Sequence, residues 1–147
     1  MTRGEEVERL VADGLLATLV DADKKEHEFA VTSLARDDLM KQVGAQGAGA
    51  PKELILEGEM EAKTDGIYEF VVDVRGWIRI EVDGAGVLED EPAGSGRQTY
   101  GVASLKAGWH HLKFRLVPAG PVDLNVLLAG DQVAVPLAGK SLRHPSR

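Results

Sequence analysis

The sequence predicts an all-β fold: an antiparallel β-sandwich with a short N-terminal helix. Two observations predict the sandwich. Between residues 54 and 128, apolar and polar side chains alternate in short runs, as they do in strands that bury one face. Glycine, proline and aspartate separate these runs, and no alternation of strands with helices supports a parallel sheet. The length of 147 residues suits a single domain.

The first segment is predicted to be helical. Within residues 4–13 the apolar side chains follow the i, i+3, i+4 spacing of a helix face, and Gly14 is a typical residue for ending a helix. We therefore expect three parts in the chain: a helical extension at residues 1–13, the sandwich at residues 14–144 and a tail at residues 145–147.

The region before residue 54 has a weaker pattern. Residues 15–20 form a compact apolar run, which predicts a buried first strand. Residues 35–43 hold too few apolar positions to predict a helix. Residues 44–51 include three glycines, so we expect a surface loop inside one domain rather than a linker.

The later segments alternate strongly, and their apolar side chains fall on one parity. Asp83-Gly84 follows one of these runs and suits a tight hairpin turn that needs positive φ. Residues 100–104 suggest a further short strand, residues 89–96 a polar loop, and residues 136–147 an irregular tail. The expected inward-facing residues are Leu54, Leu56, Met60, Tyr68, Phe70, Val72, Val74, Ile78, Ile80, Val82, Leu112, Phe114, Leu116, Leu124, Val126 and Leu128.

Composition excludes several classes of protein. The net charge of −7 disfavours a nucleic-acid partner, because binding to phosphates needs clustered lysine and arginine. No stretch approaches the ~20 apolar residues that a membrane span needs. The chain has no cysteine, which rules out disulfides, and its acidic start lacks the apolar run of a signal peptide.

Several segments occur together in an informative order. They are Gly14-Leu15-Leu16-Ala17-Thr18, Asp65-Gly66-Ile67-Tyr68-Glu69-Phe70, Ile78-Arg79-Ile80-Glu81-Val82-Asp83-Gly84 and Leu105-Lys106-Ala107-Gly108-Trp109-His110. This series resembles the protective-antigen-fourteen (PA-fourteen) domain, the lectin-like β-sandwich named after anthrax protective antigen. The resemblance covers residues 14–144. It implies a β-sandwich that binds glycans in an extracellular or cell-surface setting.

The resemblance also implies a calcium site, and this sequence departs from it. Glycan-binding members of the family carry two adjacent aspartates before the glycine that precedes the Val-Asp-Gly strand, and this pair holds Ca²⁺. The matching positions here are Val74 and Arg75, before Gly76. Neither an apolar side chain nor a guanidinium can supply the oxygen ligands that Ca²⁺ needs. Asp73 lies one position early and faces the opposite way from Val74, so we expect no calcium-dependent binding and no cofactor.

Six residues are the candidates for ligand binding. Trp77 shares its parity with the outward-facing Arg79, so it can stack on a sugar or anchor a partner protein; the alternative is packing under a neighbouring loop. Acidic residues near position 90 can hold a cation if loops converge, although solvated acidic loops are the common case. The candidates are Trp77, Arg75, Asp73, Glu89, Asp90 and Arg97.

No motif supports catalysis or a metal centre. His110 and His111 point to opposite faces of a strand and cannot chelate one metal ion, and we expect His110 to be a core or turn histidine with its own partners. The sequence lacks a Gly-x-Ser-x-Gly elbow, a phosphate-binding glycine loop and a His-Glu-x-x-His helix. We therefore expect no enzyme activity.

The expected function is a binding module. One alternative is a glycan-binding accessory domain that works without calcium, as the resemblance implies. The other is a structural or protein-docking domain of a larger bacterial assembly or multidomain enzyme, which would use Trp77, Arg75 and the loop at residues 89–97. The partner is thus a glycan or another protein, and the sequence leaves the oligomeric state open.

Overall fold

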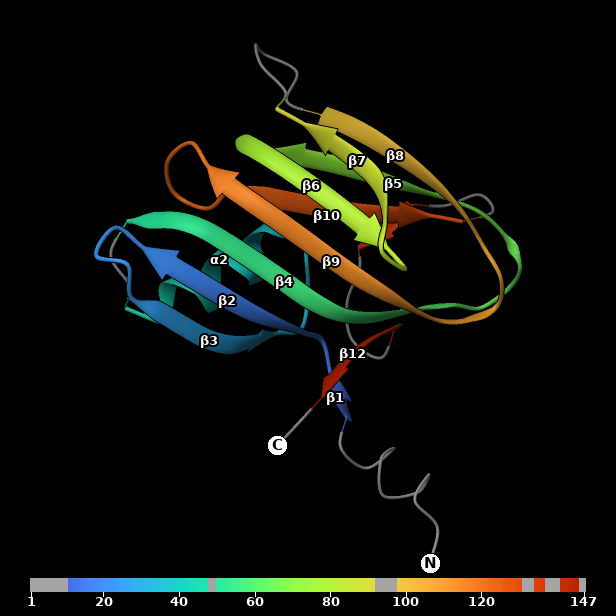
Figure 1. Ribbon diagram of the computed structural model, residues 1–147, viewed down its shortest axis with the longest axis horizontal. Coiled ribbons are helices and arrows are strands. Elements are labelled where there is room, and N and C mark those ends of the chain that lie inside the picture. The colour runs from blue at the N-terminus through green and yellow to red at the C-terminus, as the bar shows by residue number, and fades with distance from the viewer. Residues whose placement is uncertain (1–10, 48–49, 92–97, 131–133, 137–140, 146–147) are drawn as a thin grey trace, which may run out of the picture.

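The computed structural model describes residues 11–47, 50–91, 98–130, 134–136 and 141–145 (Figure 1). Two antiparallel sheets pack face to face and enclose one hydrophobic core, which confirms the predicted β-sandwich. We call them the larger sheet and the smaller sheet.

The larger sheet has eight strands, and β4 lies near its middle. β4 pairs with β9 from Leu54 to Ala62 on one side, and with β2 and β12 in succession on the other. The order is β1-β12-β4-β9-β6-β7, with β2 also on β4 and β3 on β2. The strands are β1 (Val11–Asp13), β2 (Leu15–Asp21), β3 (Glu26–Val31), β4 (Pro51–Ala62), β6 (Gly76–Val82), β7 (Ala85–Asp90), β9 (Gly108–Pro118) and β12 (Leu142–Pro145).

The smaller sheet has four strands in the order β11-β10-β5-β8. β5 passes directly into β6 of the larger sheet, so the chain changes sheets at the corner formed by residues 74–76. Figure 1 shows the smaller sheet behind β6 and β9. The strands are β5 (Gly66–Val74), β8 (Gln98–Leu105), β10 (Leu124–Ala129) and β11 (Ala134–Pro136).

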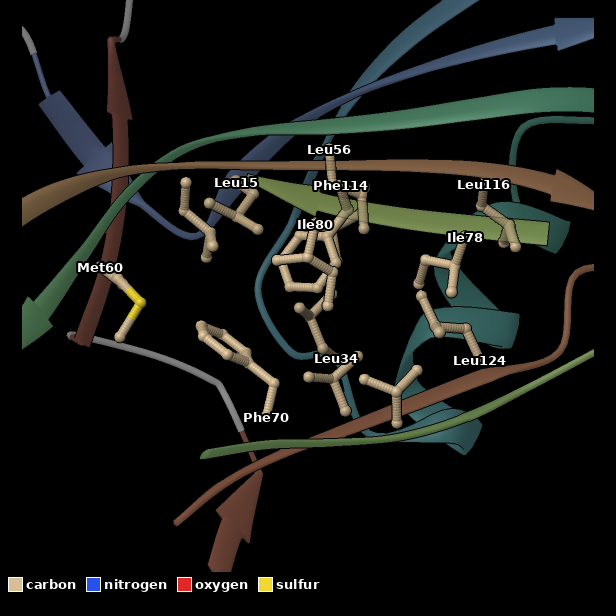
Figure 2. Packing of buried hydrophobic residues seen from close by; sticks show 14 of the residues in the cluster. Leu15, Leu34, Leu56, Met60, Phe70, Ile78, Ile80, Phe114, Leu116 and Leu124 are labelled. Atoms are coloured by element: carbon tan, nitrogen blue, oxygen red, sulfur yellow. The ribbon is translucent and has the colours of Figure 1, made fainter. Parts of the chain in front are cut away.

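The core confirms the parity predicted for the strong strands. Phe70 of the smaller sheet meets Phe114 of the larger sheet edge to face, with ring centroids 6.4 Å apart and an interplanar angle of 78° (Figure 2). Leu34 reaches the same space from the segment between β3 and the helix. The predicted inward residues of β4, β5, β6 and β9 are all buried, so the alternation in the sequence describes the real core faces.

A helix, α2 (Arg36–Gly44), occupies the segment whose pattern did not predict one. Its fully buried Leu39 anchors it in the core, and acidic side chains in its first turn suit the helix dipole. Just before it, Leu34 accepts a backbone hydrogen bond from Val126 of β10 at 3.0 Å. Tertiary contacts therefore supply what the weak periodicity lacks. Within the described part of the chain, no helix has the length and apolar character to cross a bilayer.

Two terminal segments correct the sequence expectations. Residues 11–13 form strand β1 rather than the end of a helix, and the rest of the predicted helix lies outside the described residues. Residues 142–145 form strand β12, although the tail was expected to be irregular. The two strands pair with each other, and β12 also pairs with β4. Neither short strand shows the sequence pattern of a long one, because each depends on a partner that is distant in sequence.

Candidate functional site

One end of the sandwich carries an open apolar groove, which we call the end groove. It lies between the start of β4, the β2–β3 turn, the C-terminal half of α2 and the β9–β10 loop. Two adjoining hollows of about 610 and 210 Å³ share Pro51 and Pro121 and make up the groove. Its lining residues are Leu19, Ala22, Met40, Val43, Gly44, Ala50, Pro51, Lys52, Val117, Pro118, Ala119, Gly120, Pro121 and Val122.

The β9–β10 loop is held in place by the corner between β5 and β6. The backbone N–H of Ala119 donates to the carbonyl of Arg75 at 3.2 Å, and the N–H of Arg75 donates to the carbonyl of Asp123 at 3.1 Å. Gly76 has φ +125°, and a Cβ there would lie 2.3 Å from the carbonyl oxygen of Val117. Only glycine therefore allows this close approach. The loop is consequently a fixed wall of the groove.

A charged cluster lies beside the groove and has Arg36 at its centre. The Nε of Arg36 donates to Asp123 Oδ1 at 2.7 Å, and its Nη2 lies 3.1 Å from Asp73 Oδ2. The second contact is an ion pair rather than an aligned hydrogen bond. The backbone N–H of Arg36 donates to Asn125 Oδ1 at 2.9 Å, which fixes the start of α2 against β10. Hydrogen bonding to Asp123 raises the pKa of Arg36, against the opposing effect of burial.

The guanidinium of Arg36 lies between two carboxylates, those of Asp73 and Asp123. Asp73, near the end of β5, and Asp123, directly before β10, both lie against Arg36, so their two negative charges require compensation. Arg36 provides it from within the chain. Among the described residues, no group of three acidic, histidine or cysteine side chains gathers as a metal site would require. The cluster can thus hold its carboxylates in place with a side chain in the role of the ion.

Arg75 projects from the same corner and is far less engaged. Its Nε lies 3.9 Å from Asp123 Oδ2, and its side chain is 55% exposed. The backbone bond to Ala119 joins Arg75 to a loop residue that lines the end groove. Val74, the other residue at the expected position of the acidic pair, is fully buried. The corner therefore offers guanidinium donors where the resemblance implied carboxylate acceptors.

The remaining predicted residues do not converge on this cluster. Trp77 is half-buried on the outer face of the larger sheet, directly opposite Val117, which lines the groove. Glu89 belongs to β7 rather than a loop, and its Oε1 accepts from Arg79 Nη1 at 2.7 Å. Asp90 is exposed at the end of β7. Arg97 lies outside the described residues. The structure thus brings together Asp73 and Arg75, and leaves Glu89 on the other sheet.

Sequence reasoning missed the two residues that complete the cluster, Arg36 and Asp123. They lie 87 positions apart, and neither belongs to a motif. The groove had only a weak signal in the sequence, the prolines at positions 118 and 121, which lie at the turn between two of the alternating runs. No local pattern indicated that this turn would face the start of β4.

The opposite end of the sandwich holds His110, and its contacts are structural. Its Nδ1 lies 2.7 Å from Asp83 Oδ2 and its Nε2 lies 2.6 Å from the carbonyl oxygen of Lys106. Hydrogen bonding to Asp83 raises the pKa of His110. Nearby, Arg143 packs over the ring of Trp109 at 4.0 Å from its centroid. His110 and Trp109 therefore tie strands together and contribute nothing to the groove.

No model of a known protein family matches this sequence, and no curated protein matches it. Solved structures do. The PA14 domain of the antifreeze protein MpAFP superposes with a TM-score of 0.75 at 14% identity, over 93% of each chain. This chain has a divergent PA-fourteen-like fold. The predicted resemblance and fold class are confirmed together.

Two further structural neighbours are connected with sugars, one described as sugar-binding and one solved in complex with a sugar. The PA14 sugar-binding domain of an RTX adhesin has a TM-score of 0.69 at 15% identity, over 92% of this chain and 99% of that one. The epithelial adhesin 9 to 1 A domain of Candida glabrata, a subtype-switched form solved with β-lactose, has a TM-score of 0.68 at 8% identity, over 94% and 90%. At these identities the likeness shows the PA-fourteen-like fold alone.

Proposed function

We propose that this domain is a non-catalytic carbohydrate-binding module that uses the end groove and needs no calcium. The observation that carries the proposal is the groove itself, an open apolar surface with polar groups at one rim. Sugars present apolar C–H faces and hydroxyl groups together, and binding sites of this kind combine an apolar lining with a few placed polar groups. The sugar-binding neighbours support the same class of ligand.

The residues at the corner support binding without calcium. Arg36 already balances Asp73 and Asp123, so these carboxylates are fixed in position without a metal ion. Trp77 extends the apolar wall beyond Val117, because directly opposed residues of neighbouring strands share one face of the sheet. In this proposal the ligand contacts the prolines of the loop and the edge of Trp77, and Arg75 binds its polar groups.

A non-catalytic role fits the lining of the groove, which is mostly proline, alanine and valine. General acid–base chemistry needs ionisable groups in hydrogen-bond reach of the substrate and of each other. The two carboxylates of the corner cluster, Asp73 and Asp123, are both held by Arg36. The adhesin neighbours also support a cell-surface or extracellular setting, which forms part of the proposal.

A glycan array, run once with Ca²⁺ and once with a chelator, tests this function. We expect the same glycans to bind under both conditions. The Ala119→Trp variant fills the groove from an exposed loop position and should abolish binding, and Trp77→Ala should weaken it. The matched control is Ala107→Trp, which adds the same bulk to the exposed β8–β9 turn at the opposite end. An array that stays silent in both conditions, or binding that survives Ala119→Trp, would refute the proposal.

A second candidate function rests on a different face. The outer face of the smaller sheet exposes three large apolar side chains, Ile67 (65%), Tyr100 (55%) and Val102 (56%). Exposed apolar patches of this kind often mark protein contacts. This face could join two copies of the chain, and sedimentation equilibrium over a range of concentrations tests that role. A molecular mass that stays that of a monomer at every concentration would exclude this role. Association that is unchanged in the double variant Tyr100→Ser, Val102→Ser would also exclude it.

A further inference from the structure

Arg75 differs from every other arginine that the structure describes. Arg36, Arg79 and Arg143 each have a nitrogen within 2.8 Å of a carboxylate oxygen, and Arg115 is in direct contact with Glu53. The only carboxylate contact given for Arg75 within the described chain is the 3.9 Å approach to Asp123, whose other oxygen is bound by Arg36. A guanidinium has five N–H donors, so most of those on Arg75 point to solvent.

Lys52 adds a second cation to the same groove. Lys52 lines the larger hollow of the groove and is exposed, and it makes no ion pair with any described residue. Lys52 and Arg75 flank opposite sides of the loop at residues 118–121, since β9 pairs with β4 on one side and with β6 on the other. The apolar floor thus lies between Lys52, which lines it, and Arg75, whose backbone carbonyl is bonded to Ala119 of the lining loop.

The negative charge of the rest of the molecule makes these two cations significant for an anionic ligand. The chain carries a net charge of −7, so an anionic ligand is repelled from most of its surface. On the outer face of β4, for example, Glu57 pairs with His111 and Glu59 pairs with Arg143. At the rim of the end groove a negatively charged ligand would meet Lys52, which has no ion pair with a described residue, and the weakly engaged Arg75.

We propose that the end groove selects glycans that carry a carboxylate, such as uronic or sialic acids; this inference rests on the proposed sugar-binding function. The sugar ring packs on the proline-rich floor. Its carboxylate accepts a forked pair of hydrogen bonds from Arg75, the geometry in which guanidinium and carboxylate match best. Lys52 attracts the same charge, or that of a neighbouring residue of the glycan, from the other side.

The test is a direct comparison of uronic- and sialic-acid glycans with their carboxyl-reduced forms, followed by calorimetric titration. We expect reduction of the carboxyl group to weaken binding by about tenfold or more, as expected for losing a charge-assisted hydrogen-bond pair. Arg75→Ala should cause a similar loss, and Arg75→Lys, which keeps the charge but not the fork, a smaller one. Affinity should also fall as the salt concentration rises.

Arg115→Ala is the matched control. Arg115 is 54% exposed against 55% for Arg75, but it is paired with Glu53, so its removal should leave binding unchanged. An equal loss in both variants would show unspecific attraction and overturn the inference. Groove-dependent binding that ignores carboxyl reduction, or that requires sulfate esters, would also overturn it while the sugar-binding function stands. If no glycan binds in any form, both proposals fall.

Discussion

Arg36 pairs with both carboxylates of the candidate site. A pair of partly buried carboxylates is costly unless a cation compensates it, and removing one partner of such a group costs more than the interaction is worth in isolation. Here the cation is covalently part of the chain, brought to β5 and β10 by the start of α2. In the proposed function this side chain takes the place of a calcium ion in holding the two carboxylates.

Replacing Arg36 with alanine should show how far the stability of the carboxylate pair depends on this side chain. We expect the free energy of unfolding to fall by about 1–3 kcal/mol, a value discounted from fully buried pairs because the cluster is partly exposed. Ca²⁺ should leave the Tm of the unaltered protein unchanged and raise that of the variant, because ligands that bind the native state stabilise it. Differential scanning calorimetry with Ca²⁺ and with chelator measures both effects. A calcium-dependent rise in the unaltered protein would contradict this account.

His110 provides the clearest dependence on pH. Both of its ring nitrogens face acceptors, Asp83 and the Lys106 carbonyl, so only the protonated ring can donate to both. Its pKa in the folded protein is raised, chiefly by Asp83, whose own pKa is lowered by the same bond. The groups on the facing elements are Asp83, the backbone of Lys106 and, beside them, His111.

The two pKa shifts determine how the stability changes with pH. The contribution of His110 is fully present below its unfolded pKa of about 6.5 and is lost as the pH rises through its higher folded pKa. The contribution of Asp83 is present above about pH 4 and is lost as the pH falls through its lowered pKa. Urea unfolding of the unaltered protein should therefore show stability falling from about pH 6 towards pH 8.

The His110→Ala variant should lose this pH dependence together with about 1 kcal/mol of stability at pH 6. His111→Ala is the control, because His111 is exposed and contacts only the equally exposed Glu57 through its ring. We expect it to leave the slope between pH 6 and 8 nearly unchanged. An unchanged slope in His110→Ala would show that other groups carry the effect.

At the scale of elements, the β5–β6 corner decides the shape of the groove. Gly76 combines φ +125° with close backbone contacts, whereas Gly108, at the start of β9, has φ +131° and open space around the missing side chain. The pair separates two effects of adding a methyl group. Gly108→Ala adds backbone strain alone, and Gly76→Ala adds strain and a clash with the β9–β10 loop.

We expect Gly108→Ala to lower the unfolding free energy by about 1–2 kcal/mol and Gly76→Ala by more than about 3 kcal/mol. Chemical denaturation measures both. Because Gly76 also positions the loop, its variant should lose glycan binding under conditions where it is still folded. Equal effects of the two substitutions would mean that the close approach at the corner contributes little.

The elements differ in how well their sequences predicted them. β5 and β9 were predicted with the correct inward faces, since alternation is a local property that survives in a long, half-buried strand. α2 was not, because one buried leucine and a start fixed by Asn125 hold it in place. β12 was missed for a similar reason, as it exists through pairing with β1 and β4. Elements that owe their existence to distant partners leave little trace in local sequence.

The candidate site shows the same limit at the scale of the whole molecule. Asp73 and Arg75 were singled out because they stand beside the corner where the resemblance placed an acidic pair. Arg36 and Asp123 complete the cluster from elements on either side of β5 in the chain, and only the folded arrangement of α2 and β10 brings them there. The residues beside the motif could thus be read from the sequence, but Arg36, which pairs with both carboxylates, could not.

The two sheets share one core, so the whole sandwich should unfold as a unit. Both tryptophans, Trp77 and Trp109, belong to the larger sheet, and their fluorescence reports that sheet. Far-ultraviolet circular dichroism reports both sheets. We expect the two probes to give coincident urea transitions, as in a two-state domain.

The contact between Phe70 and Phe114 is one of the links between the two sheets. In a double-mutant cycle with Phe70→Leu and Phe114→Leu, the coupling energy should be about 0.5–1.5 kcal/mol, the range for an edge-to-face aromatic pair. In the double variant the two transitions should still coincide, because the surrounding leucine and isoleucine side chains also span the interface. Additive effects with separated transitions would show instead that each sheet is stabilised independently of the other.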